Sequence, residues 1–449
     1  MPTCACWDHQ RRYCVGGLIF GYEFGRVCQF DIAGITKGKL GGFDMNQKAV
    51  DYAADSAVMQ TYGRAEISFV RGEGCWLESD SGEKYLDCAS GIAVNTLGHS
   101  HPHLVAALTE QAGKLWHTSN LYRIPGQEIV AKMLASLSGL DQVFFCNSGA
   151  EATEAAVKIA RRAAYEKGDP ERMTILCATG AFHGRTLGML AATDRPVFRT
   201  GFGPMPAGFD HVSFGNLNAL RAALGPHVAA VMVESVQGEG GAKQVPDGYL
   251  AGVREAADEF GALVIADEVQ AGIGRTGRLF SYEDTGIKPD IVALAKGLAG
   301  GFPIGAVIAS KVVGAAMTPG THGSTFGGNP LAMAAAKAVL EILGEDGFLA
   351  DVRERAAYLD TALHQLQTQF PAMVEALRGR GFLRGIRLHD SVDLPTLVKR
   401  LRNDHLLTVP AADNTLRLLP PLTIHREEID LAIAKLVAAL TAMAPRDDR

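Results

Sequence analysis

Two apolar runs of strand length, each followed by a polar residue, constrain the fold of this chain more than any other feature. The first, Ala262–Ala266, is followed by Asp267, and the second, Ile291–Ala295, is followed by Lys296. Such runs are typical of strands covered on both faces, as in the parallel sheets of α/β proteins. Ligands in these sheets bind at the carboxyl ends of the strands. We therefore expect Asp267 and Lys296 to face one crevice, although for each residue alone a buried ion pair or a solvated charge is the commoner case.

The composition excludes several classes of protein. Among 449 residues, 47% are hydrophobic and 20% are charged, and the net charge is −6. This charge provides no basic surface, so we expect no nucleic-acid partner. No uninterrupted apolar run reaches the ~18–20 residues of a membrane helix, so we expect no membrane partner either. Cys75, Cys88, Cys146 and Cys177 are scattered singly, which favours free thiols in a cytoplasmic enzyme over a disulfide framework.

Residues 1–44 differ from the rest of the chain. Four cysteines lie in this segment, but their spacing matches no pairing of the Cys-x-x-Cys type, so a zinc cluster is not favoured. The apolar patch at residues 15–20 is too short and too glycine-rich for a secretory signal. We interpret residues 1–44 as an N-terminal extension that is disordered or precedes the true start at Met45; a targeting arm is the alternative.

The remaining chain divides by its patterns. Short strand patterns separated by turn signals at residues 65–87 predict a small antiparallel meander. Strand and helix patterns alternate over residues 101–340, which is typical of a parallel α/β domain. From residue 341 onward, helices at 347–370 and 427–443 and strands around 379–388 and 415–419 indicate a second domain.

Small residues between a strand and a helix predict an anion site. Ser148, Gly149 and Ala150 follow the strand pattern 142–146 and precede a helical pattern that begins at Glu151. The free N–H groups and positive dipole of a helix start attract anions, and small side chains allow close approach to the backbone.

Three further residues on loops have the chemistry of a binding site. Phe182 could stack on a flat ring, and Arg185 could bind a carboxylate bidentately. Glu239 lies on a glycine-rich loop after the strand pattern 229–234. Taken singly, an aromatic residue in a loop and a surface arginine are the commoner interpretations of Phe182 and Arg185.

Two motifs are weighed and set aside. His99, His101 and His103 alternate, but Pro102 interrupts the run and no carboxylate or thiolate accompanies it, so we predict a turn before a helix and no metal site. Gly272–Gly277 fits the GxGxxG dinucleotide fingerprint, but no helical pattern follows it. A non-catalytic nucleotide-binding or regulatory protein built on this loop remains the non-enzyme alternative.

Together these stretches resemble the class III, fold-type I aminotransferases that use pyridoxal 5′-phosphate. The resemblance extends from about residue 65 to residue 422. The matching stretches are Gly91–Pro102, Phe144–Glu151, Asp267–Gln270, Gly274–Gly277, Ala295–Leu298, Thr321–Asn329 and Leu416–Leu422. The resemblance implies an α/β fold with a mostly parallel sheet flanked by helices in a large cofactor-binding domain, residues 101–340. It also implies a smaller α+β domain made from residues 45–100 and 341–449.

The resemblance assigns cofactor roles to residues of this chain. Lys296 is expected to bind the cofactor covalently, and Asp267 to pair with its ring nitrogen, which makes these two the catalytic residues. Phe182 and Val269 would pack on the two faces of the ring. The remaining cofactor contacts implied are Gln270 at the ring hydroxyl, Ser148, Gly149 and Ala150 at the phosphate, and Thr325 at the phosphate of a neighbouring subunit.

The resemblance also implies the substrates. Arg185 would bind the α-carboxylate, and Glu239 would pair with Arg417 and switch between the two half-reactions. The expected reaction is transamination between N2-acetylornithine and 2-oxoglutarate in a homodimer with shared active sites, as a step of arginine biosynthesis. Ornithine, 4-aminobutyrate or N-succinyl-diaminopimelate are the alternative amine donors. One position departs from the family pattern: Ser235 follows Glu234 where the family usually has proline, which we expect to loosen the Glu239 loop.

Overall fold

The computed structural model describes residues 13–15, 18–20 and 56–444. The chain forms two compact units, residues 1–66 and residues 67–449. In the first unit, β1 (Tyr13–Val15) pairs antiparallel with β2 (Leu18–Phe20). Most of the predicted extension, residues 1–44, lies outside the described residues. The proposed boundaries near residues 44, 100 and 340 remain predictions.

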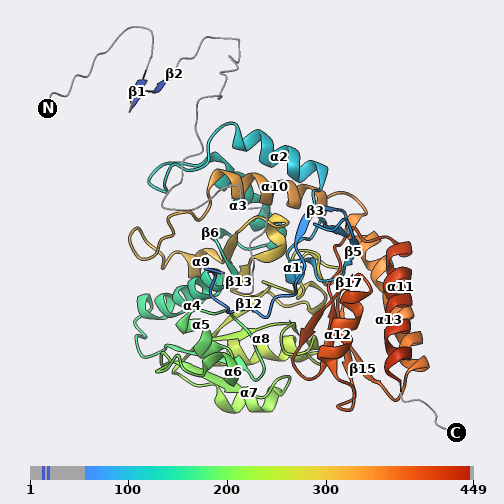
Figure 1. Cartoon of the computed structure of the whole chain (residues 1–449). Helices are drawn as coiled ribbons and strands as arrows, with labels where there is room; N and C mark the ends of the chain where they lie inside the picture. The colour runs from blue at the N-terminus through green and yellow to red at the C-terminus, as the bar shows by residue number, and fades with distance from the viewer. Residues whose placement is uncertain (1–12, 16–17, 21–55, 445–449) are drawn as a thin grey trace. The chain divides into compact units, whose positions relative to one another are not determined.

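A seven-stranded sheet is the largest element described within the second unit (Figure 1). Its strands, in spatial order, are β6 (Gln142–Cys146), β14 (Gly305–Ala309), β13 (Ile291–Leu294), β12 (Leu263–Asp267), β9 (Val228–Val233), β7 (Thr174–Ala178) and β8 (Phe209–Val212). The neighbouring pairs are parallel except for the two made by β14, which runs antiparallel to β13 and β6. The prediction of a mostly parallel sheet is therefore confirmed.

Alternate residues of β12 enter two different cores. Val264 and Ala266 belong to the hydrophobic cluster that includes α8 (Tyr249–Phe260), whereas Ile265 belongs to the cluster that includes α4 (Gly149–Glu166). Successive side chains of a strand point to opposite faces. Both faces are thus covered, and this explains why the run at 262–266 is apolar throughout.

Other helices complete the layers around the sheet. α10 (Pro330–Leu343) packs on α2 (Pro102–Ala112) and α3 (Pro125–Ser138), and α3 also contacts β6 and β14. The remaining helices of this region are α1 (Ser90–Ala93), α5 (Leu187–Ala192), α6 (Pro196–Arg199), α7 (Leu217–Ala223), η1 (Glu283–Thr285), η2 (Lys296–Ala299) and α9 (Lys311–Gly314). The described residues contain no helix with the length and apolar character needed to cross a membrane.

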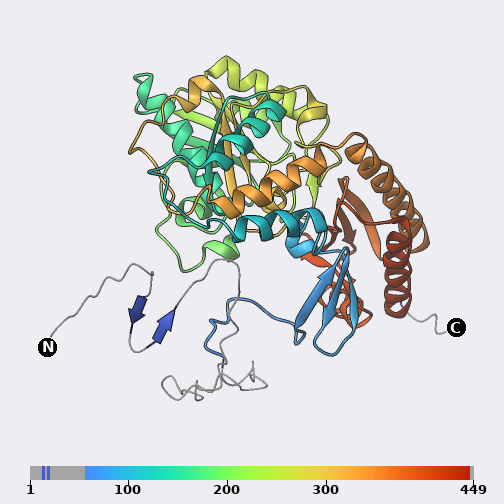
Figure 2. The same ribbon diagram turned by 90° about the horizontal axis from the view of Figure 1, so that it is seen from above.

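Segments from both ends of the second unit share a sheet. The predicted meander is confirmed as β3 (Phe69–Glu73), β4 (Trp76–Ser79) and β5 (Lys84–Asp87), which pair antiparallel in sequence. The short strand β17 (Leu406–Leu407) adds to β5 in parallel. Figure 2 shows the blue meander beside the red C-terminal segment.

A second antiparallel sheet lies in the C-terminal region. Its order is β15 (Val374–Arg380), β16 (Leu383–Leu388), β19 (Thr415–Leu418) and β18 (Val409–Ala411). The helices of this region are α11 (Phe348–Gln369), α12 (Leu394–Asn403) and α13 (Arg426–Met443), and α11 contacts β15 and α13. The predicted strand around 379–388 is not one strand: it begins at the end of β15 and crosses a turn into β16, with φ values of +80° at Gly379 and +62° at Gly381.

Candidate active site

The carboxyl ends of four parallel strands meet at a cavity of about 420 Å³. Asp267 is the last residue of β12, and Lys296 lies two residues after β13. Ser148 follows β6 and Glu234 follows β9, and all four residues line the cavity. The expected common crevice for Asp267 and Lys296 is thus present, at the edge where ligands bind in such sheets.

Lys296 has an unusual backbone and an unusual amine. Its φ is +40°, in the left-handed region that side chains with a Cβ rarely adopt. Burial lowers the pKa of Lys296 to about 8; the negative charge of Glu239 opposes this and the positive charge of Arg417 reinforces it. A sizeable neutral fraction near neutral pH makes this amine a nucleophile and a proton carrier. Strained backbone and a lowered lysine pKa together are typical of a functional lysine.

Asp267 is held by a histidine that sequence reasoning missed. The Asp267 side chain is buried, and its Oδ2 lies 2.7 Å from Nδ1 of His183, while its Oδ1 accepts the Val269 N–H at 3.0 Å. Burial acts to lower the pKa of His183, but the hydrogen bond to Asp267 raises it well above the usual value. The raised pKa of His183 favours an imidazolium that donates to the buried Asp267 carboxylate. The only signal in the sequence was the position of His183 directly after Phe182.

The first turn of α4 offers donors to an anion. Ser148 caps the helix: its Oγ accepts the Glu151 N–H at 3.2 Å and donates to Glu151 Oε2 at 2.9 Å. The N–H groups of Gly149 and Ala150 have no intrahelical partner, as at every helix start, and both residues line the cavity. A Cβ on Gly149 would lie only 2.7 Å from Val269 Cγ1, so this position requires glycine. These residues fit a phosphate group.

Phe182, Val269 and Gln270 line the same cavity. Phe182 makes an edge-to-face contact with Phe198, with ring centroids 5.9 Å apart. Gln270 directs its Oε1 to Nη1 of Arg417, at 3.0 Å. The apolar side chains of Phe182 and Val269 suit the faces of an aromatic ring bound near Lys296 and Asp267.

Arg185 reaches the cavity with its charge over aromatic rings. Its guanidinium carbon lies 3.6 Å from the centroid of Phe198 and 5.6 Å from that of Phe182. Such cation–π contacts hold an arginine without neutralising it. Because no ion pair to Arg185 is found among residues 56–444, this guanidinium can bind a substrate carboxylate.

Glu239 covers Arg417. The carboxylate Oε1 lies 2.7 Å from Arg417 Nη1, and the Arg417 side chain is only 1% exposed. Burial acts to raise the pKa of Glu239, but Arg417 outweighs it and holds that pKa below the usual value. Glu239 lines the cavity, so Arg417 lies behind it and can reach a ligand only if the carboxylate moves.

Thr325 alone among the candidate residues lies apart from this cavity. It is exposed on the loop before α10. The structure brings the other candidates to the cavity or directly behind it: Ser148, Gly149, Ala150, Phe182, Arg185, Glu239, Asp267, Val269, Gln270, Lys296 and Arg417.

Ser235 does not leave its loop loose, contrary to expectation. Its side chain is buried and hydrogen-bonds the Ser281 hydroxyl, which in turn donates to Glu268 Oε1 at 2.5 Å. Glu268 also accepts the Ser281 N–H at 2.8 Å, and burial raises the pKa of Glu268 to about 7. The serine thus anchors the loop through a hydroxyl group that proline lacks.

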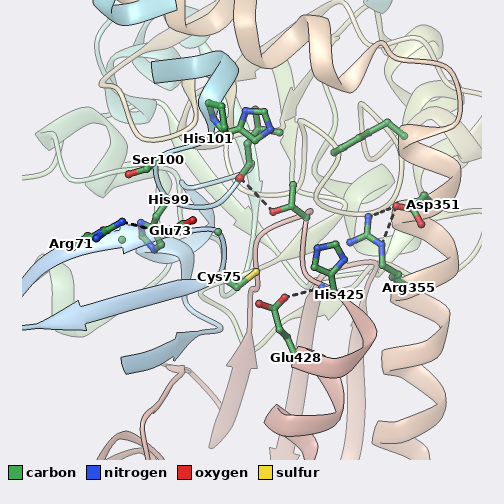
Figure 3. A pocket seen from close by; sticks show the side chains of 16 residues that line it. Arg71, Glu73, Cys75, His99, Ser100, His101, Asp351, Arg355, His425 and Glu428 are labelled. Carbon is green, nitrogen blue, oxygen red and sulfur yellow. Dashed lines mark hydrogen bonds and ion pairs between the residues drawn. The ribbon is translucent and has the colours of Figure 1, made fainter. Parts of the chain in front are cut away.

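A second cavity of about 660 Å³ lacks such a set of free groups (Figure 3). Four of its charged side chains form two pairs, Arg355 with Asp351 at 2.6 Å and Arg71 with Glu73 at 3.4 Å. A fifth, Glu428, accepts from Trp76 Nε1 at 2.8 Å. His99, which also lines it, is bound to Asp87 at 2.8 Å. Among the described residues, no group of three His, Cys, Asp or Glu side chains is arranged to hold a metal ion.

Other parts of the protein pack closely against the glycine-rich loop Gly272–Gly277. Arg275 is buried and donates to the carbonyl of Phe382 at 3.3 Å. No α-helix follows the loop before Lys311 in the described residues, only η1 and η2. The loop thus packs against C-terminal strands, and a nucleotide would lack both space and a helix start there.

These observations define the class of the protein. A lysine of lowered pKa, a buried carboxylate and a phosphate-binding helix start at one edge of a mostly parallel sheet characterise the fold-type I pyridoxal-phosphate enzymes. Further, the family model "Aminotransferase class-III" matches residues 58–440. The chain belongs to the class III aminotransferases, and its cofactor is pyridoxal phosphate.

Curated relatives and solved structures agree with this family. The chain is 51% identical over 389 residues to the acetylornithine aminotransferase of Mesorhizobium japonicum, covering 87% of this chain and 97% of that protein. It is 49% identical to that of Agrobacterium fabrum, with 88% and 98% covered.

Two solved structures are also similar. The N-acetylornithine aminotransferase of Stenotrophomonas maltophilia has a TM-score of 0.74 at 36% identity, covering 85% of this chain and 97% of that chain. The ornithine aminotransferase of Toxoplasma gondii has a TM-score of 0.83 at 33% identity, with 86% and 93% covered. In another structure of the Toxoplasma enzyme, pyridoxal phosphate partly occupies the active site.

Proposed function

We propose that this chain transfers the terminal amino group of N2-acetylornithine to 2-oxoglutarate, giving N-acetylglutamate 5-semialdehyde and glutamate, as a step of arginine biosynthesis. The observation that carries this proposal is the Glu239–Arg417 pair behind a cavity that also holds Arg185. The names of the relatives at about half identity support the same amine donor.

Each residue of the cavity has a separate role in the proposed transamination. Pyridoxal phosphate, when bound, supplies the electron sink for the carbon that loses its proton. We assign its phosphate to the helix start at Ser148, Gly149 and Ala150. Asp267, which His183 holds in place at 2.7 Å, would pair with the ring nitrogen and hold a proton there.

Lys296 would hold the cofactor covalently and, once displaced, carry the proton. Its lowered pKa of about 8 leaves part of the amine neutral, as a base requires. Phe182 and Val269 would enclose the ring and exclude water, and Gln270 would contact its edge.

Two arginines explain how one site handles two different substrates. N2-acetylornithine has one carboxylate, far from the reacting amine, whereas glutamate carries a carboxylate beside its amine and a second one further away. We assign one carboxylate of each substrate to Arg185. Glu239 would mask Arg417 for the first substrate and expose it for the second carboxylate of glutamate.

Exposed apolar residues support a homodimer. Trp116, Leu121, Tyr122 and Phe326 have side chains that are 59–86% exposed in the single chain. They lie on neighbouring segments, since Asn120 donates to the carbonyls of the 324–327 loop at 2.9–3.0 Å. Exposed apolar residues on neighbouring segments are typical of an interface between subunits. Thr325, exposed on the same loop, would then reach the phosphate of the partner subunit.

Free thiols support a cytoplasmic enzyme. Cys75, Cys88, Cys146 and Cys177 are buried and unpaired with one another in the described part of the chain. Disulfides are rare in reducing compartments, where such thiols persist.

Donor competition tests the proposed reaction. The holoenzyme is assayed with 2-oxoglutarate and, in turn, N2-acetylornithine, ornithine, 4-aminobutyrate and N-succinyl-diaminopimelate, with Lys296→Ala as the inactive control. We expect the highest kcat/KM with N2-acetylornithine. A higher value for any other donor overturns the substrate assignment, and no transamination with any donor overturns the function.

A further inference from the structure

The backbone of Glu239 is fixed although its carboxylate would have to move. Its carbonyl accepts the Ala412 N–H at 3.1 Å and Nη1 of Arg195 at 2.7 Å. The carboxylate would therefore uncover Arg417 by rotation of the Glu239 side chain, while the backbone of the loop stays anchored. Part of that anchor, Ala412, belongs to the turn between β18 and β19.

The same turn sets the position of Arg417. Arg417 lies on β19, opposite Val409 of β18 and Gly385 of β16. The hairpin closes through the three residues 412–414, of which Asp413 and Asn414 take left-handed φ values of +57° and +42°. Any shift of this turn thus moves Arg417 and the anchor of Glu239 together.

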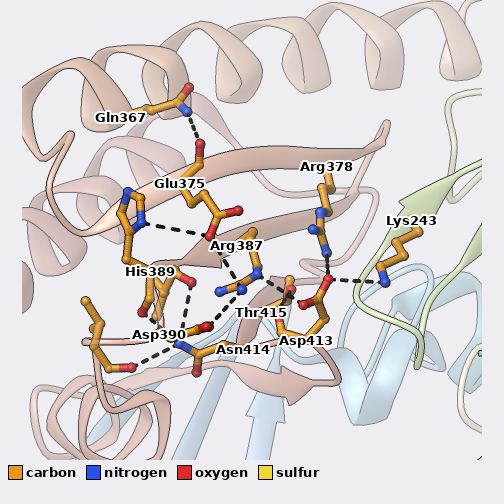
Figure 4. A network of polar contacts seen from close by, with 12 residues as sticks. Lys243, Gln367, Glu375, Arg378, Arg387, His389, Asp390, Asp413, Asn414 and Thr415 are labelled. Atoms are coloured by element: carbon orange, nitrogen blue, oxygen red, sulfur yellow. Dashed lines mark hydrogen bonds and ion pairs between the residues drawn. The ribbon is translucent and has the colours of Figure 1, made fainter.

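Asp413 ties the turn to three different segments (Figure 4). Its Oδ2 accepts from Arg378 of β15 at 2.7 Å and lies 3.1 Å from Nζ of Lys243, and its Oδ1 lies 3.2 Å from Nε of Arg387 of β16. Lys243 belongs to β11 (Lys243–Gln244), which pairs with β10 (Val236–Gln237) at the other end of the Glu239 loop. The half-buried carboxylate thus joins the hairpin of Arg417 to the loop of Glu239.

We propose that Asp413 is a positioning residue for substrate selection: through Lys243, Arg378 and Arg387 it holds Arg417 where the second carboxylate of glutamate or 2-oxoglutarate binds. This inference rests on the proposed function, because it assumes that Arg417 receives that carboxylate. Asp413 itself lines no part of the active-site cavity and would act only through the hairpin and the loop.

The test compares the effect of one substitution on two Michaelis constants, that for 2-oxoglutarate and that for N2-acetylornithine. In Asp413→Asn, we expect the KM for 2-oxoglutarate to rise about fivefold, the size expected from weakening partly exposed ion pairs. The KM for N2-acetylornithine and kcat should stay within about twofold, because Arg185 and Lys296 are untouched. Lys243→Gln should raise the same KM less, since one of three partners is lost, and Lys243→Arg should restore it.

Asp390→Asn is the matched control. Asp390 also binds Arg387, at 2.8 Å, but its side chain is 88% exposed and no contact joins it to the Glu239 loop. We expect wild-type kinetics for this variant. The proposal is overturned if Asp413→Asn behaves like Asp390→Asn, or if it lowers kcat and changes both KM values equally, as a purely structural defect would.

The test can still be interpreted if Asp413→Asn does not fold or if the enzyme prefers another amine donor. If Asp413→Asn does not fold, as judged by its melting temperature, Lys243→Gln carries the test alone, because this lysine is 39% exposed. If the wild-type enzyme prefers another donor, the substrate assignment fails, but the KM for 2-oxoglutarate still tests the role of Asp413 with that donor.

Discussion

Replacing His183 tests how the site holds the buried Asp267 side chain. His183 and Asp267 form a fully buried pair at 2.7 Å, with exposed side-chain fractions of 0% and 4%. Removing one partner of a buried charge pair costs ~3–5 kcal/mol of folding stability, because the other charge stays buried without compensation. We therefore expect His183→Ala to lose about 3 kcal/mol or more in urea unfolding.

His183→Asn separates the charge from the hydrogen bond. The asparagine amide can donate from nearly the position of Nδ1 but carries no charge, so we expect a smaller loss than for His183→Ala. A hydrogen bond to a charged group contributes ~1.5–3 kcal/mol, which corresponds to a factor of about 10 to 160 in rate if it is lost in the transition state. Steady-state kinetics of the holoenzyme should show a kcat lowered in that range for His183→Ala and less for His183→Asn.

The difference in folding stability between wild type and His183→Ala should depend on pH, which gives an independent check. The folded-state pKa of His183 lies well above its unfolded value of about 6.5. The stabilisation from the charge pair is therefore fully present below pH ~6.5 and is lost as pH rises through the folded pKa. The gap between wild type and His183→Ala should shrink with rising pH. A gap that grows above pH 6.5, or equal stability of all three proteins, would refute the reasoning.

Four further predictions concern the same cavity. Asp267→Ala should lower kcat by several powers of ten, each tenfold being ~1.4 kcal/mol of barrier, and an unchanged rate in steady-state assays would contradict its role. Lys296→Ala should retain the cofactor on gel filtration yet lose turnover; residual wild-type activity would exclude it as the proton carrier. Glu239→Ala should alter the two half-reactions unequally in single-turnover measurements, and equal, unaffected rates would exclude a switch with Arg417. In the apoenzyme, an amine-selective reagent should modify Lys296 with a rate that is half-maximal near pH 8, because burial favours the neutral amine; a midpoint near 10.5 would contradict the lowered pKa.

The sheet and most of the site could be predicted from the sequence because both depend on local patterns. The runs before Asp267 and Lys296 are apolar because each strand is buried on both faces, and parallel strands bring their carboxyl ends together. Ser148-Gly149-Ala150 was visible as a helix start between a strand and a helix.

The features that could not be predicted from the sequence depend on contacts between distant segments. His183 and Asp267 are 84 residues apart, and no local pattern relates a histidine in a loop to an acid at a strand end. The sequence alone indicates that Ser235 loosens its loop, because the partner of its hydroxyl group, Ser281, lies on another loop 46 residues away. The pairing of β17 with β5 joins segments more than 300 residues apart, which hydrophobic periodicity cannot reveal.

Borohydride trapping followed by peptide mapping tests the central claim most directly. The purified protein is expected to show a visible absorption band of bound pyridoxal phosphate that reduction abolishes. After digestion, mass spectrometry should find the reduced cofactor on the peptide that contains Lys296. Attachment to a different lysine, or no trapped cofactor at all, would contradict the account.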